Sequence, residues 1–224
     1  MTWWLVALWG GAVGLDATSF PQAMISRPLV AAPITGLLLG RPLEGVAVGA
    51  VLEIFALVIL PIGAARYPES GTAAVAAAAG YALASGGEPR PELLLLAVGF
   101  ALVWERVGGA SVNVLRRVNE RLVAGAAERR PPTASRLERL HGTALVLDFV
   151  RGAAVSVVGA ALALGLLALP GAGGEGEGAA AVGVLSVASA AMIGASLSLF
   201  DGWSGRRLAL VLGALCGLTL LLVP

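Results

Sequence analysis

The chain has 224 residues, of which 58% are hydrophobic and only 13% charged, and its mean hydropathy is +0.88. A soluble domain of this length cannot bury so much apolar surface, so the composition predicts an all-α polytopic membrane protein embedded in a lipid bilayer. The net charge of +1 gives no electrostatic reason to expect a nucleic-acid partner.

The single cysteine and the single histidine limit the chemistry that the chain can carry. Cys216 has no partner for an internal disulfide, and His141 leaves too few ligands for a histidine-based metal cluster or a phosphohistidine relay. The sequence contains no Ser-His-Asp arrangement, phosphate-binding loop or dinucleotide fingerprint. We expect no catalytic residue, no metal site and no cofactor.

Eight apolar stretches predict about six to eight helices. They lie at 3–15, 29–40, 43–60, 71–85, 91–112, 150–169, 179–200 and 206–223. A helix needs about 20 residues to cross the hydrocarbon core of a bilayer, and the first, second and fourth stretches are shorter than that. Short segments indicate re-entrant or broken helices, which are tolerated inside protein or beside a water-filled cavity. We expect such segments in the N-terminal half.

Local signals place the starts of the first helices. Trp3 and Trp4 are typical of interfacial anchors, and no basic residue precedes the first apolar stretch, so this stretch is predicted to be a retained membrane segment rather than a signal peptide. Pro28 and Pro42 each follow an arginine and precede an apolar stretch. Proline suits the first turn of a helix because its φ angle is fixed and no N–H is needed there, so both mark predicted helix starts.

Glu53 lies inside the apolar run from Gly45 to Leu60. A charged side chain at the centre of a spanning helix costs about 2.5–3.5 kcal/mol on insertion scales, so it persists mostly where it has a function. Gly45, Gly49 and Glu53 are four residues apart and share one helical face, where the glycines allow another backbone to approach. We interpret Glu53 as a substrate or ion contact; a carboxylate that is protonated or paired for structural reasons is the alternative.

Two polar segments flank this region along the chain, one after the first apolar stretch and one at 61–70. Their carboxylates and amides can make paired hydrogen bonds with the hydroxyls of a sugar. The predicted substrate-binding residues are Asp16, Gln22, Ser26, Arg27, Glu53, Gly63, Arg66 and Glu69. Ordinary extramembrane loops would have a similar composition, and this alternative stays open.

Arginine, the only basic residue type besides the single histidine, is concentrated in the middle of the chain. Residues 113–141 carry seven of the fifteen arginines, and the positive-inside rule therefore places this segment in the cytoplasm. The chain is thus divided into an N-terminal membrane region with the substrate site (1–112), a cytoplasmic Arg-rich amphipathic loop (113–149) and C-terminal membrane helices (150–224).

The Arg-rich loop is predicted to form two amphipathic helices lying on the inner membrane surface. Leu115, Val118 and Leu122 share one face of the first helix, Pro131 and Pro132 end it, and a second apolar stripe follows. A solvated charged face explains this pattern, whereas docking of a soluble partner is the sharper hypothesis. The candidate docking residues are Arg116, Arg117, Arg121, Arg136 and Arg139.

The remaining charged residues of interest lie near the ends of predicted spans. Asp148 and Arg151 are three residues apart and are expected to form an ion pair on one helix near the inner interface. Glu105, Arg106 and Asp201 are expected to be interfacial.

A series of motifs in residues 10–75 resembles a known family. The motifs are Leu15-Asp16, Ser26-Arg27-Pro28-Leu29-Val30, Gly36-x3-Gly40, Gly45-x3-Gly49-x2-Leu52-Glu53, and Ile62-Gly63-Ala64-Ala65 with Pro68. Their order and spacing resemble the IIC component of the mannose/fructose/sorbose family, a permease subunit of the bacterial sugar phosphotransferase system (PTS). Weaker agreement continues from Arg117 to Asn119 and through His141 and Arg151.

The resemblance implies a multi-pass subunit that binds a hexose-type sugar and translocates it across the bacterial inner (cytoplasmic) membrane. It further implies a IID membrane subunit as partner, trimers of IIC–IID pairs, and an elevator-like movement of a core that carries the sugar. Phosphorylation is then expected on separate IIA and IIB phosphocarriers, so the chain itself is not expected to be an enzyme. Glu53 falls at the Leu-Glu position of the family.

Three features depart from the family pattern. The chain ends at Pro224 where another apolar helix is expected, Pro61 stands where some members carry a polar residue, and 171–178 is a Gly/Glu linker. The alternative function is a non-transporting membrane scaffold or sensor that docks a PTS protein through its arginine-rich face. An intramembrane enzyme is a third reading, for which the sequence offers no nucleophile–base pair.

Overall fold

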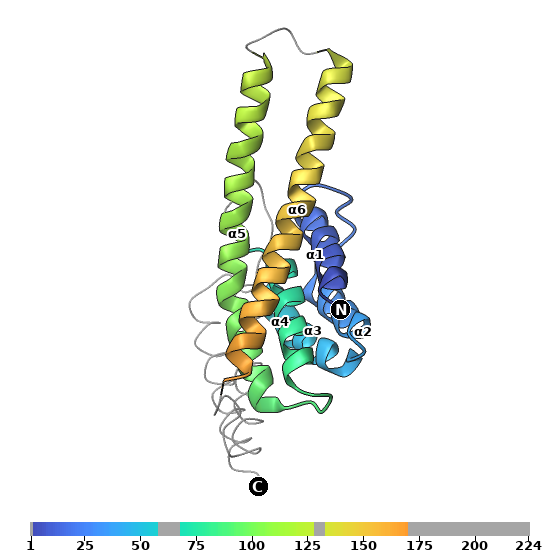
Figure 1. Cartoon of the computed structure of the whole chain (residues 1–224), viewed down its shortest axis with the longest axis vertical. Coiled ribbons are helices and arrows are strands. Elements are labelled where there is room, and N and C mark those ends of the chain that lie inside the picture. Colours follow the sequence, from blue (N-terminus) through green and yellow to red (C-terminus); the bar gives the residue numbers. More distant parts are fainter. Residues whose placement is uncertain (1, 58–67, 128–132, 170–224) are drawn as a thin grey trace, which may run out of the picture.

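A computed structural model describes residues 2–57, 68–127 and 133–169, and over these ranges the chain forms six helices and no strand (Figure 1). The helices are α1 (Trp3–Thr18), α2 (Pro28–Leu38), α3 (Pro42–Ala56), α4 (Ser70–Ala84), α5 (Pro91–Ala127) and α6 (Ala134–Leu167). The all-helical prediction is confirmed for this part of the chain. The apolar stretches expected at 179–200 and 206–223 lie outside the described residues.

The helices fall into two length classes. At 1.5 Å per residue, α5 and α6 are about 55 and 51 Å long, whereas α1 to α4 are only about 17–24 Å long, less than the roughly 30 Å hydrocarbon core of a bilayer. Of the helices described, two are long and apolar enough to cross a membrane, α5 and α6. Figure 1 shows both running past the four short helices and projecting beyond them at one end.

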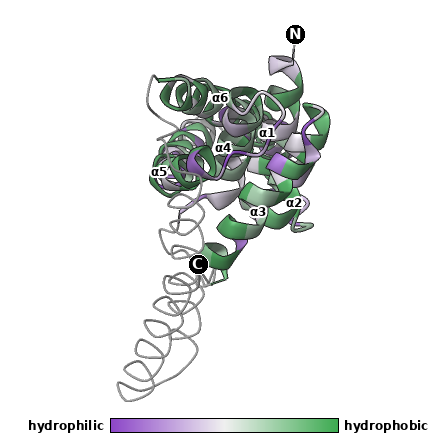
Figure 2. Cartoon of the chain, turned by 90° about the horizontal axis from the view of Figure 1, so that it is seen from below, coloured by the Kyte–Doolittle hydropathy of each residue, from purple (hydrophilic) through white to green (hydrophobic). Residues whose placement is uncertain are grey.

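Helix α4 forms the centre of the molecule. Every residue from Gly71 to Ala82 is buried, and α1, α2, α3, α5 and α6 all pack against it (Figures 1 and 2). Alanine and glycine dominate its sequence, so its side chains are small and five neighbouring helices can approach its backbone closely. A short apolar segment is therefore accommodated inside protein, as the sequence predicts.

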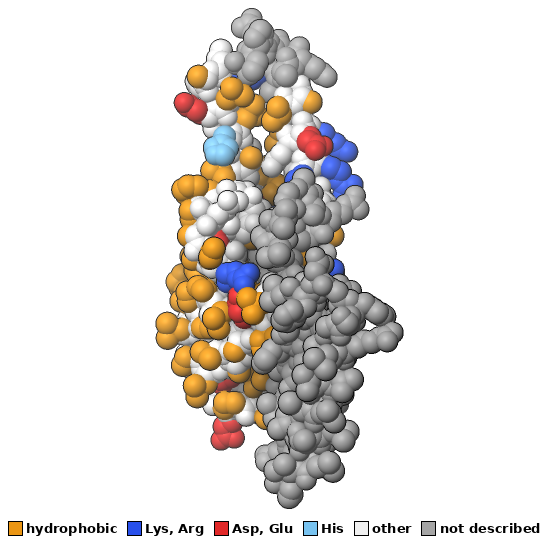
Figure 3. Space-filling model, turned by 180° about the vertical axis from the view of Figure 1, so that it is seen from behind, with side chains coloured by type: hydrophobic (Ala, Val, Ile, Leu, Met, Phe, Trp, Pro, Cys, Tyr) orange, Lys and Arg blue, Asp and Glu red, His pale blue; other side chains and the backbone are white. Residues whose placement is uncertain are grey.

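Large apolar side chains cover much of the outer surface. Trp4, Leu37, Leu43 and Val103 are 57%, 66%, 67% and 67% exposed. In Figure 3 hydrophobic side chains cover the described part of one face, and charged ones gather toward the projecting end. This distribution fits a molecule whose sides face lipid.

Helices α2 and α3 form an antiparallel hairpin held by glycine contacts. Pro28 and Pro42 are the first residues of the two helices, as predicted. A Cβ atom added at Gly45 would lie 2.5 Å from the carbonyl oxygen of Ala32, and one added at Gly49 would lie 2.7 Å from that of Pro28. The predicted glycine face therefore exists, and α2 is the backbone that approaches it.

The Arg-rich segment differs from its prediction. The two short amphipathic helices expected within 113–149 are continuous parts of α5 and α6, and the expected boundaries at 112/113 and 149/150 fall inside these helices. The reason is that no proline occurs between Pro91 and Pro131 or between Pro132 and Pro170, so nothing in the sequence ends either helix earlier. We call residues 113–127 of α5 and 134–147 of α6 the projecting hairpin.

The glycine contacts of the α2–α3 hairpin predict a specific cost for adding one methyl group. Gly45→Ala and Gly49→Ala should each lower stability by about 1–3 kcal/mol through overpacking against backbone, seen as a lower thermal unfolding midpoint in detergent. Gly99→Ala is the control, because no described atom lies within 4 Å of its added Cβ. It should be neutral or slightly stabilising, and equal effects at all three positions would contradict the proposed packing.

Candidate functional site

Polar side chains gather where the short helices begin and end. Hydrogen bonds connect the end of α1 to α6, the start of α2 to α3, and the start of α4 to α6. Helix ends carry backbone N–H and C=O groups without intrahelical partners. Where such ends lie at membrane depth, protein groups must satisfy them, and these ends are a typical location for a transporter's binding site.

Asp16, in the last turn of α1, fixes the shape of the loop 19–27. Its buried carboxylate accepts hydrogen bonds from the backbone N–H groups of Ala23 at 2.5 Å and Ser26 at 2.9 Å. Within this loop Gln22 and Met24 have φ angles of 59° and 64°, a conformation that costs a non-glycine residue about 1–2 kcal/mol. The two charge-assisted hydrogen bonds, worth about 1.5–3 kcal/mol each, offset that strain.

Glu53 is paired with Arg27. The Arg27 Nη2 and Nε atoms lie 2.5 and 2.8 Å from Glu53 Oε1, and the N–H of Leu29 donates to Oε2 at 3.0 Å. Leu29 lies in the first turn of α2, where the helix dipole favours a carboxylate. The side chains of Arg27 and Glu53 are 36% and 15% exposed, so the pair lies at a surface that a ligand can reach.

A second group of charges, which we call the ion cluster, consists of Glu69, Asp148 and Arg151. The Arg151 Nη1 and Nη2 atoms donate to the two carboxylate oxygens of Glu69 at 2.7 and 3.0 Å, and Nε donates to Asp148 Oδ1 at 2.9 Å. Arg151 also donates to Ser111 Oγ and to the carbonyl oxygen of Gly14. The cluster thus joins α1, α5 and α6 to the residue that precedes α4.

The ion cluster also holds the start of the loop 19–27. The hydroxyl groups of Thr18 and Ser19 both donate to Asp148 Oδ2. On the far side of the loop, a Cβ atom added at Gly71 would lie 2.6 Å from the carbonyl oxygen of Ser26. The loop therefore lies between α6 and the first turn of α4. The ion cluster and the polar residues of the loop adjoin each other.

The predicted substrate-binding residues separate into three groups. Asp16, Gln22, Ser26, Arg27 and Glu53 lie on or beside the loop 19–27, with Gln22 exposed. Glu69 lies in the ion cluster, where both of its oxygens are already paired with Arg151. The remaining two, Gly63 and Arg66, lie outside the described residues.

Sequence reasoning missed several members of this region. Thr18 and Ser19 belong to the polar segment after the first apolar stretch but were not among the predicted binding residues, and the uncharged Ser111 gave no signal. The ion pair between Asp148 and Arg151 is confirmed. The spacing of the two residues on one helix did not indicate that both side chains are largely buried, or that Arg151 also pairs with Glu69.

Glu105, expected to be interfacial, is packed inside the protein. It is buried on α5, 6% exposed, and its carbonyl oxygen accepts a hydrogen bond from the N–H of Glu69. The neighbouring Arg106 side chain is 73% exposed. The interfacial position of Glu105 along the membrane normal stays a prediction, and α5, on which it lies, continues beyond the expected span end to Ala127. Asp201, also expected to be interfacial, lies outside the described residues.

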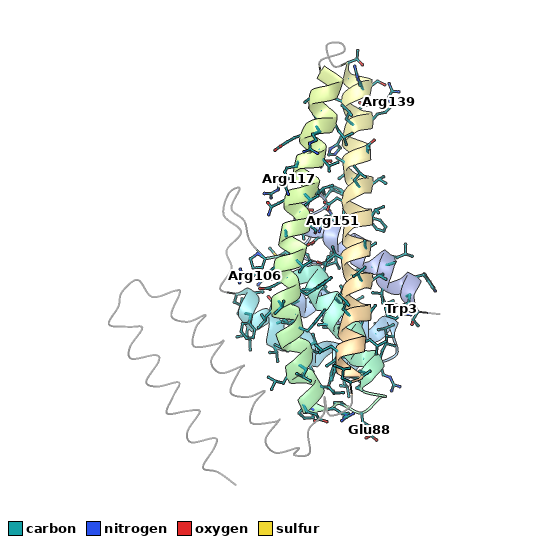
Figure 4. All side chains as sticks on the ribbon, turned by 60° about the vertical axis from the view of Figure 1, so that its left-hand side comes forward. Trp3, Glu88, Arg106, Arg117, Arg139 and Arg151 are labelled. Atoms are coloured by element: carbon teal, nitrogen blue, oxygen red, sulfur yellow. The ribbon has the colours of Figure 1, made fainter. Side chains whose placement is uncertain are left out.

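The candidate docking arginines all lie on the projecting hairpin. Arg116, Arg117, Arg121 and Arg139 are exposed and Arg136 is half-buried. Figure 4 shows Arg117 and Arg139 on the two projecting helices and Arg151 below both, between α5 and α6, while Glu88 lies at the opposite end of the molecule. The arginines therefore form a surface separate from the loop 19–27.

The chemistry available at the loop 19–27 is hydrogen bonding. A carboxylate, a guanidinium and an amide can each bind hydroxyl groups directionally, and the carboxylate oxygens of Glu53 keep acceptor capacity beyond Arg27 and Leu29. Among the residues described, no group of three His, Cys, Asp or Glu side chains is arranged to hold a metal ion.

Comparisons with known proteins relate the chain to sugar permease subunits. A protein-family model described as "PTS system sorbose-specific iic component" matches residues 1–165. The PTS system sorbose-specific EIIC component of Lacticaseibacillus casei is 30% identical over 149 residues, which are 66% of this chain and 51% of that protein. The chain therefore spans about half the length of this relative.

The fold itself has also been seen before. A solved structure described as "Structure of membrane protein" matches with a TM-score of 0.70, covering 93% of this chain and 83% of the other. The two sequences are 18% identical, so this similarity shows the shared fold alone.

The contacts of Asp16 predict how the loop 19–27 responds to its loss. Asp16→Asn replaces one acceptor oxygen with an NH₂ group that faces a backbone N–H, so the loop should open more readily. Amide hydrogen exchange at Ala23 and Ser26 should then be faster by about ten- to a hundredfold, the equivalent of the 1.5–3 kcal/mol of a charged hydrogen bond.

Gln22→Gly is the matched control for this experiment, since glycine adopts a positive φ angle without strain. Exchange at Ala23 and Ser26 should be unchanged or slower in this variant. Unaltered exchange in Asp16→Asn would show that the carboxylate does not hold the loop.

Proposed function

The chain belongs to the sorbose-specific IIC family of the phosphotransferase system and is a membrane protein; on this premise we propose that it binds a hexose-type sugar and carries it across the bacterial inner membrane. The sugar would be phosphorylated by separate proteins as it is delivered, and the chain itself would perform no chemistry.

The observation that supports a sugar site most directly is the partly exposed pair of Arg27 and Glu53. It lies where α2 begins and α3 nears its end, beside the loop that presents Gln22. A hydroxyl group can donate to a carboxylate oxygen and accept from a guanidinium at the same time, so a vicinal pair of sugar hydroxyls would bind alongside the ion pair, one to a remaining lone pair of Glu53 and the other to a remaining N–H of Arg27. Gln22 would add a third contact that fixes the orientation of the ring.

The predicted site residues fall into two groups, those free to contact a sugar and those that hold the shape of the site. Glu53, Arg27 and Gln22 retain hydrogen-bonding capacity toward a ligand, and we propose them as direct contacts. Asp16 and Glu69 have their oxygens engaged by protein donors, so we propose that they shape the site. Ser26, Gly63 and Arg66 remain candidates from the sequence pattern.

The partners follow from the family assignment and belong to the same proposal. A IID membrane subunit would pair with this chain, three such pairs would associate, and soluble IIA and IIB proteins would carry the phosphoryl group. We propose the projecting hairpin as the docking surface for one of these soluble proteins, because its five arginines face the cytoplasm under the positive-inside rule.

The projecting hairpin also favours a second candidate function, that of a scaffold or sensor that docks a PTS protein without transporting sugar. Docking requires the arginines of the hairpin alone, whereas transport requires the loop 19–27 and Glu53 as well. The two experiments below address these regions separately.

Replacing Glu53 tests the sugar contact. Glu53→Gln keeps the shape of the side chain but removes its charge, so a reconstituted IIC–IID pair should bind its hexose about ten- to a hundredfold more weakly, as expected for loss of a charged hydrogen bond. Binding of sorbose, fructose, mannose and glucose would be measured by equilibrium titration.

A control variant and a stability measurement separate sugar contact from pairing with Arg27. Glu44→Gln removes a buried carboxylate of α3 that contacts Ser85 instead and should leave sugar affinity unchanged. If Glu53→Gln lowers the unfolding midpoint while sugar affinity stays the same, Glu53 is a structural partner of Arg27 and the assignment fails.

Neutralising the projecting hairpin tests docking. The triple variant Arg116→Gln, Arg117→Gln and Arg121→Gln should lower the association rate of the soluble partner about tenfold at low salt and flatten its salt dependence, because electrostatic steering is lost. The rate would be followed by surface plasmon resonance with the chain in lipid nanodiscs.

Arg90→Gln serves as the control, since Arg90 precedes α5 at the end opposite the projecting hairpin. It should leave the association rate unchanged. An equal loss in both variants would mean that overall charge matters rather than the hairpin.

A further inference from the structure

We propose that Arg151 and Asp148 are positioning residues of the sugar site, which hold the loop 19–27 and the residue before α4 in a fixed relation to each other. The proposal rests on the proposed function only for the identity of the ligand. Neither residue belongs to the set that the sequence marks as substrate-binding.

The first step is that the two residues are inaccessible to a sugar. The side chains of Asp148 and Arg151 are 1% and 9% exposed, and their polar atoms are occupied by protein partners. Any effect that they have on sugar binding must therefore act through other residues.

The second step concerns the contacts of Asp148 with the loop 19–27, which we call the loop arm of the ion cluster. Asp148 Oδ2 accepts hydrogen bonds from Thr18 and Ser19, the last residue of α1 and the first of the loop. Asp16 then holds the middle of the loop from within α1. The loop is thus attached at its start to α6 and at Ala23 and Ser26 to α1, and Gln22 is carried between these attachments.

The third step concerns the contact of Arg151 with Glu69, the residue before α4. The guanidinium of Arg151 makes a bidentate contact with Glu69, whose backbone N–H donates to Glu105 on α5. Glu69 precedes α4, whose first turn packs on Ser26 through Gly71. A shift of Glu69 would therefore move the surface against which the loop rests.

The fourth step is the shape of the arginine itself. Arg151 donates simultaneously to Glu69, Asp148, Ser111 and Gly14. A planar guanidinium has five N–H donors in a fixed arrangement, whereas a lysine ammonium has three and acts as a point charge. Arg151→Lys therefore keeps the charge and loses the geometry, which makes it a test of positioning.

The test measures loop order and sugar affinity separately. A spin label is attached at Ala23→Cys, an exposed position of the loop, in a chain that also carries Cys216→Ser. In Arg151→Lys and in Asp148→Asn the label should become more mobile in its electron paramagnetic resonance spectrum. Without the label, the same two variants should bind the hexose at least tenfold more weakly in the IIC–IID pair.

Tyr81→Phe is the matched control, because it removes a buried hydroxyl of α4 that contacts Arg90, about 18 Å along the helix axis from Glu69. It should lower the unfolding midpoint without changing label mobility or sugar affinity. If Arg151→Lys does not fold, the double variant Thr18→Val and Ser19→Ala breaks only the loop arm and should show both effects.

The outcomes separate this proposal from the proposed function. Increased mobility with weakened binding supports it, whereas unchanged mobility in folded variants, or increased mobility with unchanged affinity, overturns it. If the unaltered chain binds none of the four hexoses but the label still responds, the loop is held as proposed and the sugar assignment is what fails.

Discussion

The contact between the Arg151 guanidinium and two buried carboxylates is the interaction on which the polar part of this molecule depends. Charges inside a membrane protein are stable only when they are paired and hydrogen-bonded, and removal of one partner leaves an uncompensated charge. Here a single arginine satisfies Glu69 and Asp148 and also reaches Ser111 and Gly14. Three helices and the start of a fourth are therefore fixed at one point.

The short helices make such a point necessary. A helix that ends inside the membrane exposes backbone groups that lipid cannot satisfy, and α1 to α4 are each too short to cross the hydrocarbon core. Asp16 binds two N–H groups of the loop that follows α1, and Glu53 binds one in the first turn of α2. The carboxylates thus have a structural role at helix ends in addition to any role toward a ligand.

Sequence reasoning predicted the features that depend on local pattern. The short N-terminal segments, the starts at Pro28 and Pro42 and the glycine face of α3 follow from composition and spacing, and the structure has them. Sequence reasoning could not predict which residues far apart in the chain form ion pairs, because the contact of Arg151 with Glu69 spans 82 positions. Nor did the arginines of the projecting hairpin reveal that its helices are continuous with the apolar parts of α5 and α6.

The composition of α4 has a consequence for conformational entropy. Ala76 to Gly80 at its centre have no side-chain rotamers to lose when they are buried. Folding therefore orders these five residues at the cost of backbone freedom alone. The largely buried Arg151, whose long side chain does lose rotamers, lies instead beside the loop 19–27, so part of the side-chain entropy cost falls where order determines what can bind.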